Sequence, residues 1–309
     1  MGAVRHYFPH YDGADVSAEK VGSLRIRGEQ DVNGKQETSV ATRIFIHLIL
    51  ILGALTMLLP FCWMITTSIK TYADSVQIPP VWIPTHPDFS WYGKIFEQVP
   101  FGRYYMNTIM VAVGRTVPQV IFCSMAAYGF SRLRFPGRNV IFIGVLAILM
   151  VPSQVLLIPQ YYEMVRFHWV DTYRALIVPG IFSAYGTFLL RQFFMSLPKE
   201  LEEAAIIDGC NPWTIFWRIL LPLTVPALSA LTFFAVLWSW NDFIWPLVVT
   251  NDDSMKVLSV GINSLQGVYV SKQPLLMAGA AMATVPLLIF FLVLQKFVIK
   301  GITFSGIKG

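Results

Sequence analysis

Long apolar stretches constrain the fold of this 309-residue chain more than any other feature of its sequence. A helix needs about 20 apolar residues to cross the roughly 30 Å hydrocarbon core of a bilayer, because it rises about 1.5 Å per residue. We predict a membrane-spanning helix over each of six stretches: Ile44–Ile65, Tyr105–Tyr128, Val140–Gln160, Ala175–Phe194, Ile219–Trp240 and Leu275–Ile299. The predicted fold class is therefore all-α, a polytopic membrane protein.

The composition agrees with a membrane protein and argues against an ordinary soluble one. Hydrophobic residues make up 55% of the chain and charged residues 13%, whereas soluble domains carry about 25% charged residues. The net charge of +5 does not indicate nucleic-acid binding, because the basic residues form short clusters beside the apolar stretches. The three cysteines and five histidines lack the spacing of metal ligands, so no metal site and no enzymatic activity are predicted.

The distribution of Lys and Arg predicts the orientation of the chain, because basic residues favour the cytoplasmic side of a membrane. They gather in the first 43 residues, after the second and fourth spans, and near the C-terminus. We therefore predict that both termini are cytoplasmic. Residues 1–43 are predicted to form a cytoplasmic tail, and residues 44–309 a single transmembrane domain.

The loop between the fourth and fifth spans, residues 196–213, is too polar to cross a bilayer and is strongly patterned. Pro198 suits the first position of a short helix, and Gly209 can end that helix by adopting a positive φ. Asn211 then suits the cap of the next helix. Helical spacing places a set of small or apolar residues and one carboxylate on a single face, which we predict to receive a partner: Leu201, Ala204, Ala205 and Asp208.

This loop resembles the EAA signature of ATP-binding-cassette importer permeases. The resemblance rests on Glu203–Ala205, on Asp208–Gly209 and on the sequence ILLP at Ile219–Pro222, which follows at the matching distance. Further segments resemble the maltose-type, carbohydrate-importing branch of that family: Ala127–Arg138, Leu189–Phe194, Trp240–Leu247 and Lys308–Gly309. The alternative reading of the loop is an amphipathic helix that only lies at the membrane interface.

The resemblance implies a type I importer permease in a bacterial plasma membrane. Its expected partners are a homologous second permease, a cytoplasmic ATPase dimer and an extracytoplasmic solute-binding protein that delivers a carbohydrate. Glu203, Ala204, Ala205, Asp208 and Gly209, together with Leu201, are expected to couple the ATPase to the spans. The chain has no G-x-x-x-x-G-K-[ST] phosphate loop, so ATP and Mg²⁺ are expected on the partner ATPase and no cofactor on this chain.

Arg115 lies near the middle of the second predicted span, where a charged side chain is costly and indicates a functional site. No acidic residue lies between Glu97 and Glu163, so its own span and the next offer no counter-charge. Three explanations remain open: a partner elsewhere in the chain, snorkelling toward the outer surface, or an anionic substrate. The third would make the cargo an acidic, uronate-type oligosaccharide.

An aromatic and polar cluster ends the fifth predicted span, at residues 238–245. Its members could line the substrate pathway by stacking on sugar rings and bonding hydroxyl groups: Trp238, Trp240, Asn241 and Asp242. The alternative is an aromatic belt or helix packing.

Two rival functions remain at this stage. An ion-coupled secondary sugar transporter would need acidic residues within its spans, and the acid-free stretch of residues 98–162 counts against it. A membrane scaffold without transport activity would not need the patterned loop.

Overall fold

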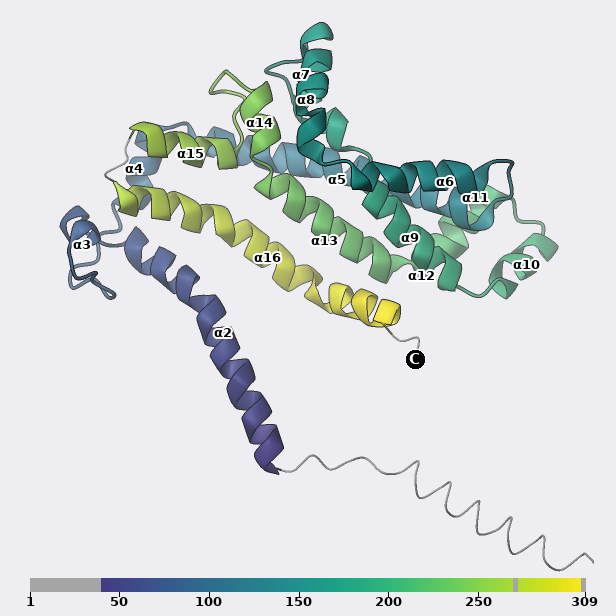
Figure 1. The fold of residues 1–309 in the computed structure, drawn as a ribbon, viewed down its shortest axis with the longest axis horizontal. Coiled ribbons are helices and arrows are strands. Elements are labelled where there is room, and N and C mark those ends of the chain that lie inside the picture. The colour runs from purple at the N-terminus through teal and green to yellow at the C-terminus, as the bar shows by residue number, and fades with distance from the viewer. Residues whose placement is uncertain (1–39, 269–271, 307–309) are drawn as a thin grey trace, which may run out of the picture. The chain divides into compact units, whose positions relative to one another are not determined.

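The computed structural model describes residues 40–268 and 272–306. Most of the predicted cytoplasmic tail, residues 1–39, and the Lys308–Gly309 ending that contributes to the resemblance therefore lie outside the described residues. All regular structure in the described residues is helical (Figure 1), which confirms the all-α prediction. The chain divides into two compact parts, residues 1–59 and 60–309, and each is described by itself.

The first described part, residues 40–59, belongs to the long helix α2, whose side chains here are exposed and mostly apolar. The second part contains the end of α2 and all other helices. The α-helices are α2 (Val40–Ser68), α3 (Tyr72–Val76), α4 (Trp91–Gln98), α5 (Phe101–Arg132), α6 (Arg138–Ala147), α7 (Leu157–Arg166), α8 (Tyr173–Ile177), α9 (Ala184–Ser196), α10 (Glu200–Ile207), α11 (Pro212–Thr214), α12 (Leu221–Leu223), α13 (Val225–Asn241), α14 (Ile244–Val249), α15 (Leu258–Val268) and α16 (Gln273–Gly306). Short 3₁₀ or π segments join some of them: η1 (Ile148–Met150), η2 (Ser153–Leu156), η3 (Val178–Gly180) and η4 (Ile215–Leu220).

Helices with the length and apolarity of a membrane span occur at four of the six predicted places: Val40–Ser68, Phe101–Arg132, Tyr173–Ser196 and Gln273–Lys296. The other two predicted spans, the third and the fifth, are not continuous helices. The pair Arg138–Met150 and Ser153–Arg166 is bent by 94°, and the pair Pro212–Leu223 and Val225–Asn241 by 78°. The chain thus has four to six candidate spans among its described residues.

Proline explains both bends. Val151 is extended, with φ −88° and ψ 118°, because the ring of Pro152 disfavours a helical conformation for the preceding residue. The second bend lies at Thr224, which has φ −90° and ψ 6° and is flanked by Pro222 and Pro226. Since proline has no N–H, the hydrogen-bond ladder of the helix is interrupted at these places.

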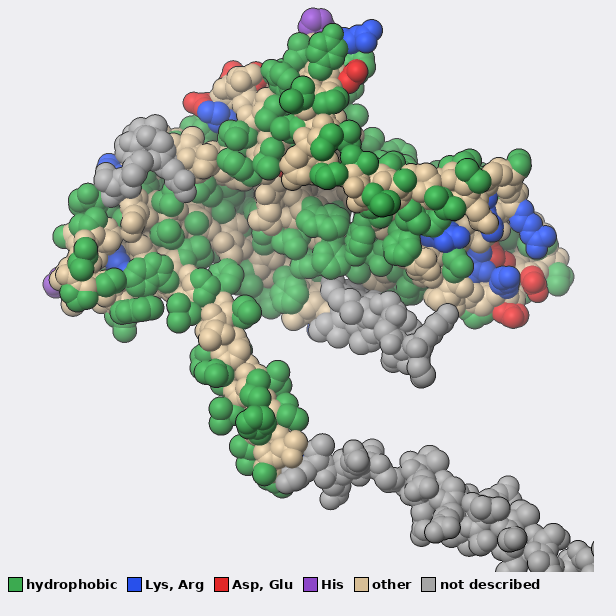
Figure 2. Space-filling model, in the orientation of Figure 1, with side chains coloured by type: hydrophobic (Ala, Val, Ile, Leu, Met, Phe, Trp, Pro, Cys, Tyr) green, Lys and Arg blue, Asp and Glu red, His purple; other side chains and the backbone are tan. Residues whose placement is uncertain are grey.

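Helix α5 is the central element of the second part, where it packs against α9, α13 and α15 (Figure 1). Three clusters of buried side chains are arranged along α5. The first, at the start of α5, includes residues of α4 and α16, and the second, nearer its middle, includes residues of α8 and α14. The third, at the end of α5, includes residues of α9 and η4. Hydrophobic side chains cover much of the visible surface of these helices, while charged ones gather at the end where α10 lies (Figure 2). This pattern fits helices that face lipid.

Close packing of α15 on α5 depends on Gly261, because a Cβ atom there would overlap the ring of Tyr104. The Tyr104 side chain is fully buried and has no room to withdraw. We expect Gly261→Ala to lower the free energy of unfolding by about 1–3 kcal/mol, the usual cost of an overpacked core. Thermal unfolding in detergent measures this, with Gly102→Ala as the control, since a Cβ at Gly102 meets nothing within 4 Å. Equal losses in both variants would contradict the packing argument.

Candidate functional site

Helix α10 and the turn after it form the first candidate site. Gly209 has φ +80° and ends the helix, as predicted. Two hydrogen bonds close this end of the helix. Gly209 N–H donates to the Ile206 carbonyl at 3.0 Å, and Cys210 N–H donates to the Ala205 carbonyl at 2.9 Å. This pair of bonds is the Schellman motif, which favours glycine at the left-handed position. Asn211 caps the next helix by accepting a hydrogen bond from Thr214 N–H at 2.8 Å, also as predicted.

The start of α10 differs from the prediction. The helix begins at Glu200, with Lys199 at the cap position, so Pro198 lies outside the helix. The Lys199 carbonyl accepts the first hydrogen bonds, from the N–H groups of Glu202 and Glu203. Proline at position 198 therefore precedes the helix instead of opening it.

The structure also divides the predicted docking face of α10. Leu201, Ala204 and Asp208 are exposed as expected, but Ala205 is 5% exposed and packs into the core cluster at the end of α5. Ala205 is therefore an inward-facing residue, because α10 lies against η4 and needs a small side chain there. The largest exposed apolar residues of α10 are Ile206 and Ile207, at 61% and 85%.

Arg132, at the end of α5, holds α10 in place. Its Nη2 donates to the carbonyl oxygens of Phe194 and Leu197 at 2.6 and 2.8 Å, and its Nη1 lies 3.2 Å from the carboxylate of Glu202. The Arg132 side chain is 5% exposed and that of Glu202 16%. Arg132 thus joins the ends of α5 and α9 to α10. Nothing in the local sequence pattern indicates this contact, because Glu202 lies 70 residues further along the chain.

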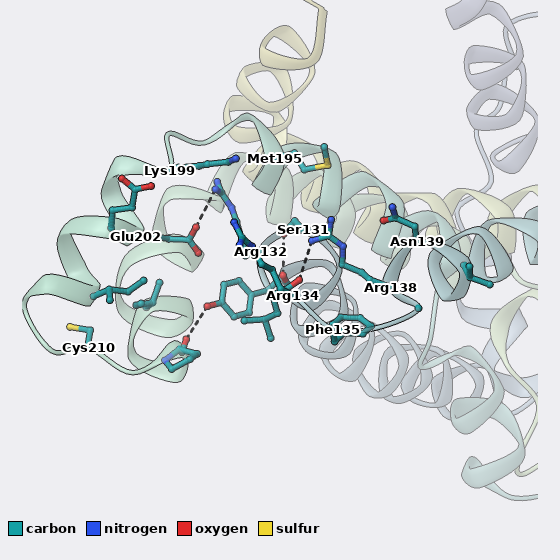
Figure 3. A pocket seen from close by; sticks show the side chains of 18 residues that line it. Ser131, Arg132, Arg134, Phe135, Arg138, Asn139, Met195, Lys199, Glu202 and Cys210 are labelled. Carbon is teal, nitrogen blue, oxygen red and sulfur yellow. Dashed lines mark hydrogen bonds and ion pairs between the residues drawn. The ribbon is translucent and has the colours of Figure 1, made fainter.

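A pocket of about 940 Å³ opens beside α10 (Figure 3). Its walls come from the end of α5, the connection to α6 and the first turn of α10. Four basic and two acidic side chains line it, namely Arg132, Arg134, Arg138, Lys199, Glu202 and Glu203. We call it the basic pocket.

The second candidate site is an ion pair in the middle of α5. Arg115 Nη1 lies 2.7 Å from the carboxylate of Asp242, and the side chains are 11% and 23% exposed. Arg115 Nε donates to the carbonyl of Leu176. Of the three explanations for Arg115, the structure selects a partner elsewhere in the chain.

Gly180 makes room for this arrangement. A Cβ at Gly180 would lie 2.8 Å from Arg115 Nε and 2.9 Å from its Cδ, so glycine lets the Arg115 side chain lie against the backbone. At 1.5 Å per residue along α5, Arg115 is about 25 Å from Arg132. The two candidate sites therefore lie at different depths of the same helix.

Two cavities meet at this ion pair. One, of about 620 Å³, is lined by the pair itself, by Gln154 of η2 and Gln160 of α7, and by Asn241 at the end of α13. The other, of about 340 Å³, is lined by Gln119, Ser183, Trp238 and Ser239. Arg115, Asp242 and Gly180 belong to both cavities.

The predicted pathway residues therefore separate into two groups. Asn241 and Asp242 line the larger cavity, and Trp238, which is 51% exposed, lines the smaller one. Trp240 lines neither, because it is 9% exposed and its Nε1 donates to the carbonyl of Ala283 in α16 at 3.1 Å. This packing of Trp240 against α16 agrees with the helix-packing alternative and gives no support to a place for its side chain in the pathway. No group of three or more potential metal-ligating side chains occurs among the described residues.

Comparisons with solved structures agree with this fold. A bacterial ABC transporter involved in the import of the acidic polysaccharide alginate has a chain that matches with a TM-score of 0.74 and 27% identity, over 84% of this chain and 99% of that one. A chain of an alginate ABC transporter in complex with an alginate pentasaccharide-bound periplasmic protein matches with a TM-score of 0.60. At 15% identity over 82% of this chain and 93% of that one, the second match supports the fold alone.

Sequence relatives extend over most of the chain. The arabinooligosaccharides transport system permease protein AraQ of Halalkalibacterium halodurans is 39% identical over 68% of this chain and 75% of that protein. The sn-glycerol-3-phosphate transport system permease protein UgpE of Yersinia pestis is 32% identical over 85% of this chain and 96% of that protein. Residues 119–304 match the family model described as binding-protein-dependent transport system inner membrane component. The chain belongs to this family of inner-membrane permeases of ABC transporters, as its EAA-like motif indicated.

Proposed function

We propose that this permease imports a carbohydrate and that a separate ATPase drives its alternating access through α10. The observation that carries the proposal is the attachment of α10, whose first turn is joined by Arg132 to the ends of α5 and α9. A push on the exposed residues of α10 would reach both helices through this buried guanidinium. The exposed apolar side chains of Ile206 and Ile207 suit contact with a partner protein.

The proposed assembly has the parts that the resemblance implies. A homologous permease completes the pathway, an ATPase dimer binds ATP and Mg²⁺ on the cytoplasmic side, and an extracytoplasmic binding protein delivers the cargo. We place both termini of this chain in the cytoplasm because of its basic clusters. In this mechanism ATP binding closes the ATPase dimer and opens the pathway outward, and hydrolysis returns it inward.

The Arg115–Asp242 pair and its two cavities are the proposed part of the pathway in this chain. The cavity walls offer both donors and acceptors, from Gln154, Gln160, Asn241 and the ion pair, and such groups suit the hydroxyls of a sugar. An oligosaccharide is supported by the relative AraQ, which is named as a permease of an arabinooligosaccharide transport system.

An acidic oligosaccharide is a second candidate for the cargo, supported by the structural relative that takes part in alginate import. The ion pair changes the argument from Arg115, because Asp242 already neutralises its charge. A cargo carboxylate would have to compete with Asp242 for the guanidinium. The test compares the uptake of uronate and of neutral oligosaccharides by wild type and by Arg115→Met. If the cargo is acidic, Arg115→Met should lose uronate uptake selectively.

Gly209 offers a sharp test of the proposed coupling. Proline at this position is held near φ −65° and lacks an N–H, so Gly209→Pro loses both the +80° conformation and the hydrogen bond to Ile206. We expect uptake to fall by about tenfold or more, since forcing the backbone of this turn away from its conformation costs about 1–3 kcal/mol. Binding-protein-stimulated ATPase activity and uptake are the measurements.

Gly209→Asn is the matched control, because asparagine tolerates the left-handed region and a Cβ at this position meets nothing within 4 Å. The control should keep most of its uptake. Full uptake and normally stimulated ATPase activity in Gly209→Pro would show that the turn is not needed for coupling.

Purification from native membranes tests the whole proposal against its rivals. We expect an ATPase to copurify and to be stimulated by binding protein loaded with one class of oligosaccharide. Uptake that follows an ion gradient without an ATPase would instead establish a secondary transporter. Absence of both activities would favour a scaffold.

A further inference from the structure

The basic pocket carries more positive charge than its own carboxylates balance. Four basic side chains face two acidic ones, and one of the acidic ones, Glu202, is already paired with Arg132. Arg134 is exposed, and Arg138 donates from Nη1 to the Leu133 carbonyl at 3.0 Å. Figure 3 shows the labelled side chains of Arg132, Arg134, Arg138 and Lys199 around the same space.

A buried donor in this pocket lacks an acceptor. Nε of Arg132 is buried and has no hydrogen-bond partner among the described residues, although the other two nitrogens of the guanidinium are bonded. Leaving a buried donor of a charged group unsatisfied is costly, and an ordered water or a bound ion can supply the missing acceptor. An anion in the pocket would supply such an acceptor and also balance the excess positive charge.

The apolar rim of the pocket joins a surface suited to lipid. Leu133, Phe135 and Met195 are 38–53% exposed around it, and Val140, at 74%, leads into α6. Along α6 the exposed side chains continue with Ile141 and Ile143. An amphiphile could therefore place its charged end among the arginines and its hydrocarbon along α6.

We propose that the basic pocket binds a phosphate group, with an anionic phospholipid of the inner membrane as its main source. Basic pockets at the cytoplasmic ends of membrane helices commonly bind such head groups, and Arg binds phosphate through its planar fork of donors. The site would also accept free phosphate, which offers the same oxygens without the chain. Because Glu202 and Glu203 also line the pocket, a bound anion would place negative charge beside the first turn of α10.

The test uses the intact transporter, purified with its associated subunits and reconstituted in nanodiscs of phosphatidylcholine with or without phosphatidylglycerol. Native mass spectrometry measures the retained phosphatidylglycerol. We expect the double variant Arg134→Gln/Arg138→Gln to bind it about thirtyfold more weakly, because each basic residue near an anionic lipid changes affinity by about fivefold. Arg134→Lys/Arg138→Lys should keep most of the binding.

The matched control is Arg166→Gln/Arg174→Gln, which removes two exposed arginines on α7 and α8, away from the pocket. It should leave lipid retention unchanged. Inorganic phosphate added in pure phosphatidylcholine nanodiscs distinguishes the sources: displacement of phosphatidylglycerol by phosphate supports a site for the phosphate group itself, whereas no displacement supports the lipid alone.

Equal retention of phosphatidylglycerol by wild type and the glutamine variant would overturn the proposal. If the glutamine variant then also loses a copurifying subunit, the basic pocket is a protein interface. Because lipid retention is measured without transport, the outcome is independent of the proposed cargo and of the role of Gly209.

Discussion

Asp242→Leu is expected to destabilise the protein and abolish uptake, because it leaves the Arg115 guanidinium without its carboxylate. The Arg115 side chain is 11% exposed, and removing one partner of a buried ion pair costs about 3–5 kcal/mol. Arg115→Met should cost less, since Asp242 is 23% exposed and lines a cavity that water can enter. Thermal unfolding in detergent and uptake in proteoliposomes measure the two effects.

The double variant Arg115→Met/Asp242→Leu separates stability from transport. Apolar replacement of both partners removes the unpaired charge, so the double variant should regain most of the stability lost by Asp242→Leu. If the pair belongs to the pathway, uptake should remain low. Asp253→Asn is the control, because its ion pair with Lys256 is largely exposed (66% for Asp253) and such pairs contribute little. Wild-type uptake by the double variant would remove the ion pair from the pathway.

Arg132→Met is expected to uncouple α10 from the spans. The change leaves the Glu202 carboxylate and the carbonyls of Phe194 and Leu197 without their donor, at an expected cost of about 3 kcal/mol. The core cluster formed by Phe194, Phe216 and their neighbours stays intact, so the fold should persist. We expect uptake to fall by about tenfold or more and ATPase activity to lose its dependence on the binding protein.

Two further variants test whether geometry or charge matters at position 132. Arg132→Lys keeps the charge but lacks the planar fork that reaches two carbonyls and a carboxylate together, so it should rescue only part of the uptake. Glu202→Gln removes the ion pair and leaves the bonds to α9, so its effect should be smaller than that of Arg132→Met. Normal coupling in Arg132→Met would mean that α10 transmits motion by another route.

The ion pair also bears on the choice between transport mechanisms. An ion-coupled transporter needs an acidic residue that can release its charge within the spans. Asp242 is such a residue by position, but its carboxylate lies 2.7 Å from Arg115 Nη1. A carboxylate held in this ion pair is not available to bind a coupling ion, which agrees with a pathway whose energy comes from a partner ATPase.

Sequence reasoning predicted the features that depend on neighbours along the chain. The positions of all six apolar stretches follow from the thickness of a bilayer, and the turn at Gly209 and the cap at Asn211 follow from local backbone geometry. Pro152, Pro222 and Pro226 lie in or beside two of the predicted spans and can kink a helix, but breaks of 94° and 78° did not follow from the sequence. A proline can kink, break or merely bend a membrane helix, and the contacts of the neighbouring helices decide which of these occurs.

The tertiary structure alone decided which residues of the candidate sites meet. Arg115 finds Asp242 across 127 positions of the chain and Arg132 finds Glu202 across 70, and Ala205 and Trp240 turn out to pack inward. Periodicity identifies a face of a helix, but it does not say whether that face meets lipid, a partner or the chain's own core. That choice depends on how α5, α9, α13 and α16 pack together, because only packing brings distant charges within 4 Å and leaves cavities between them.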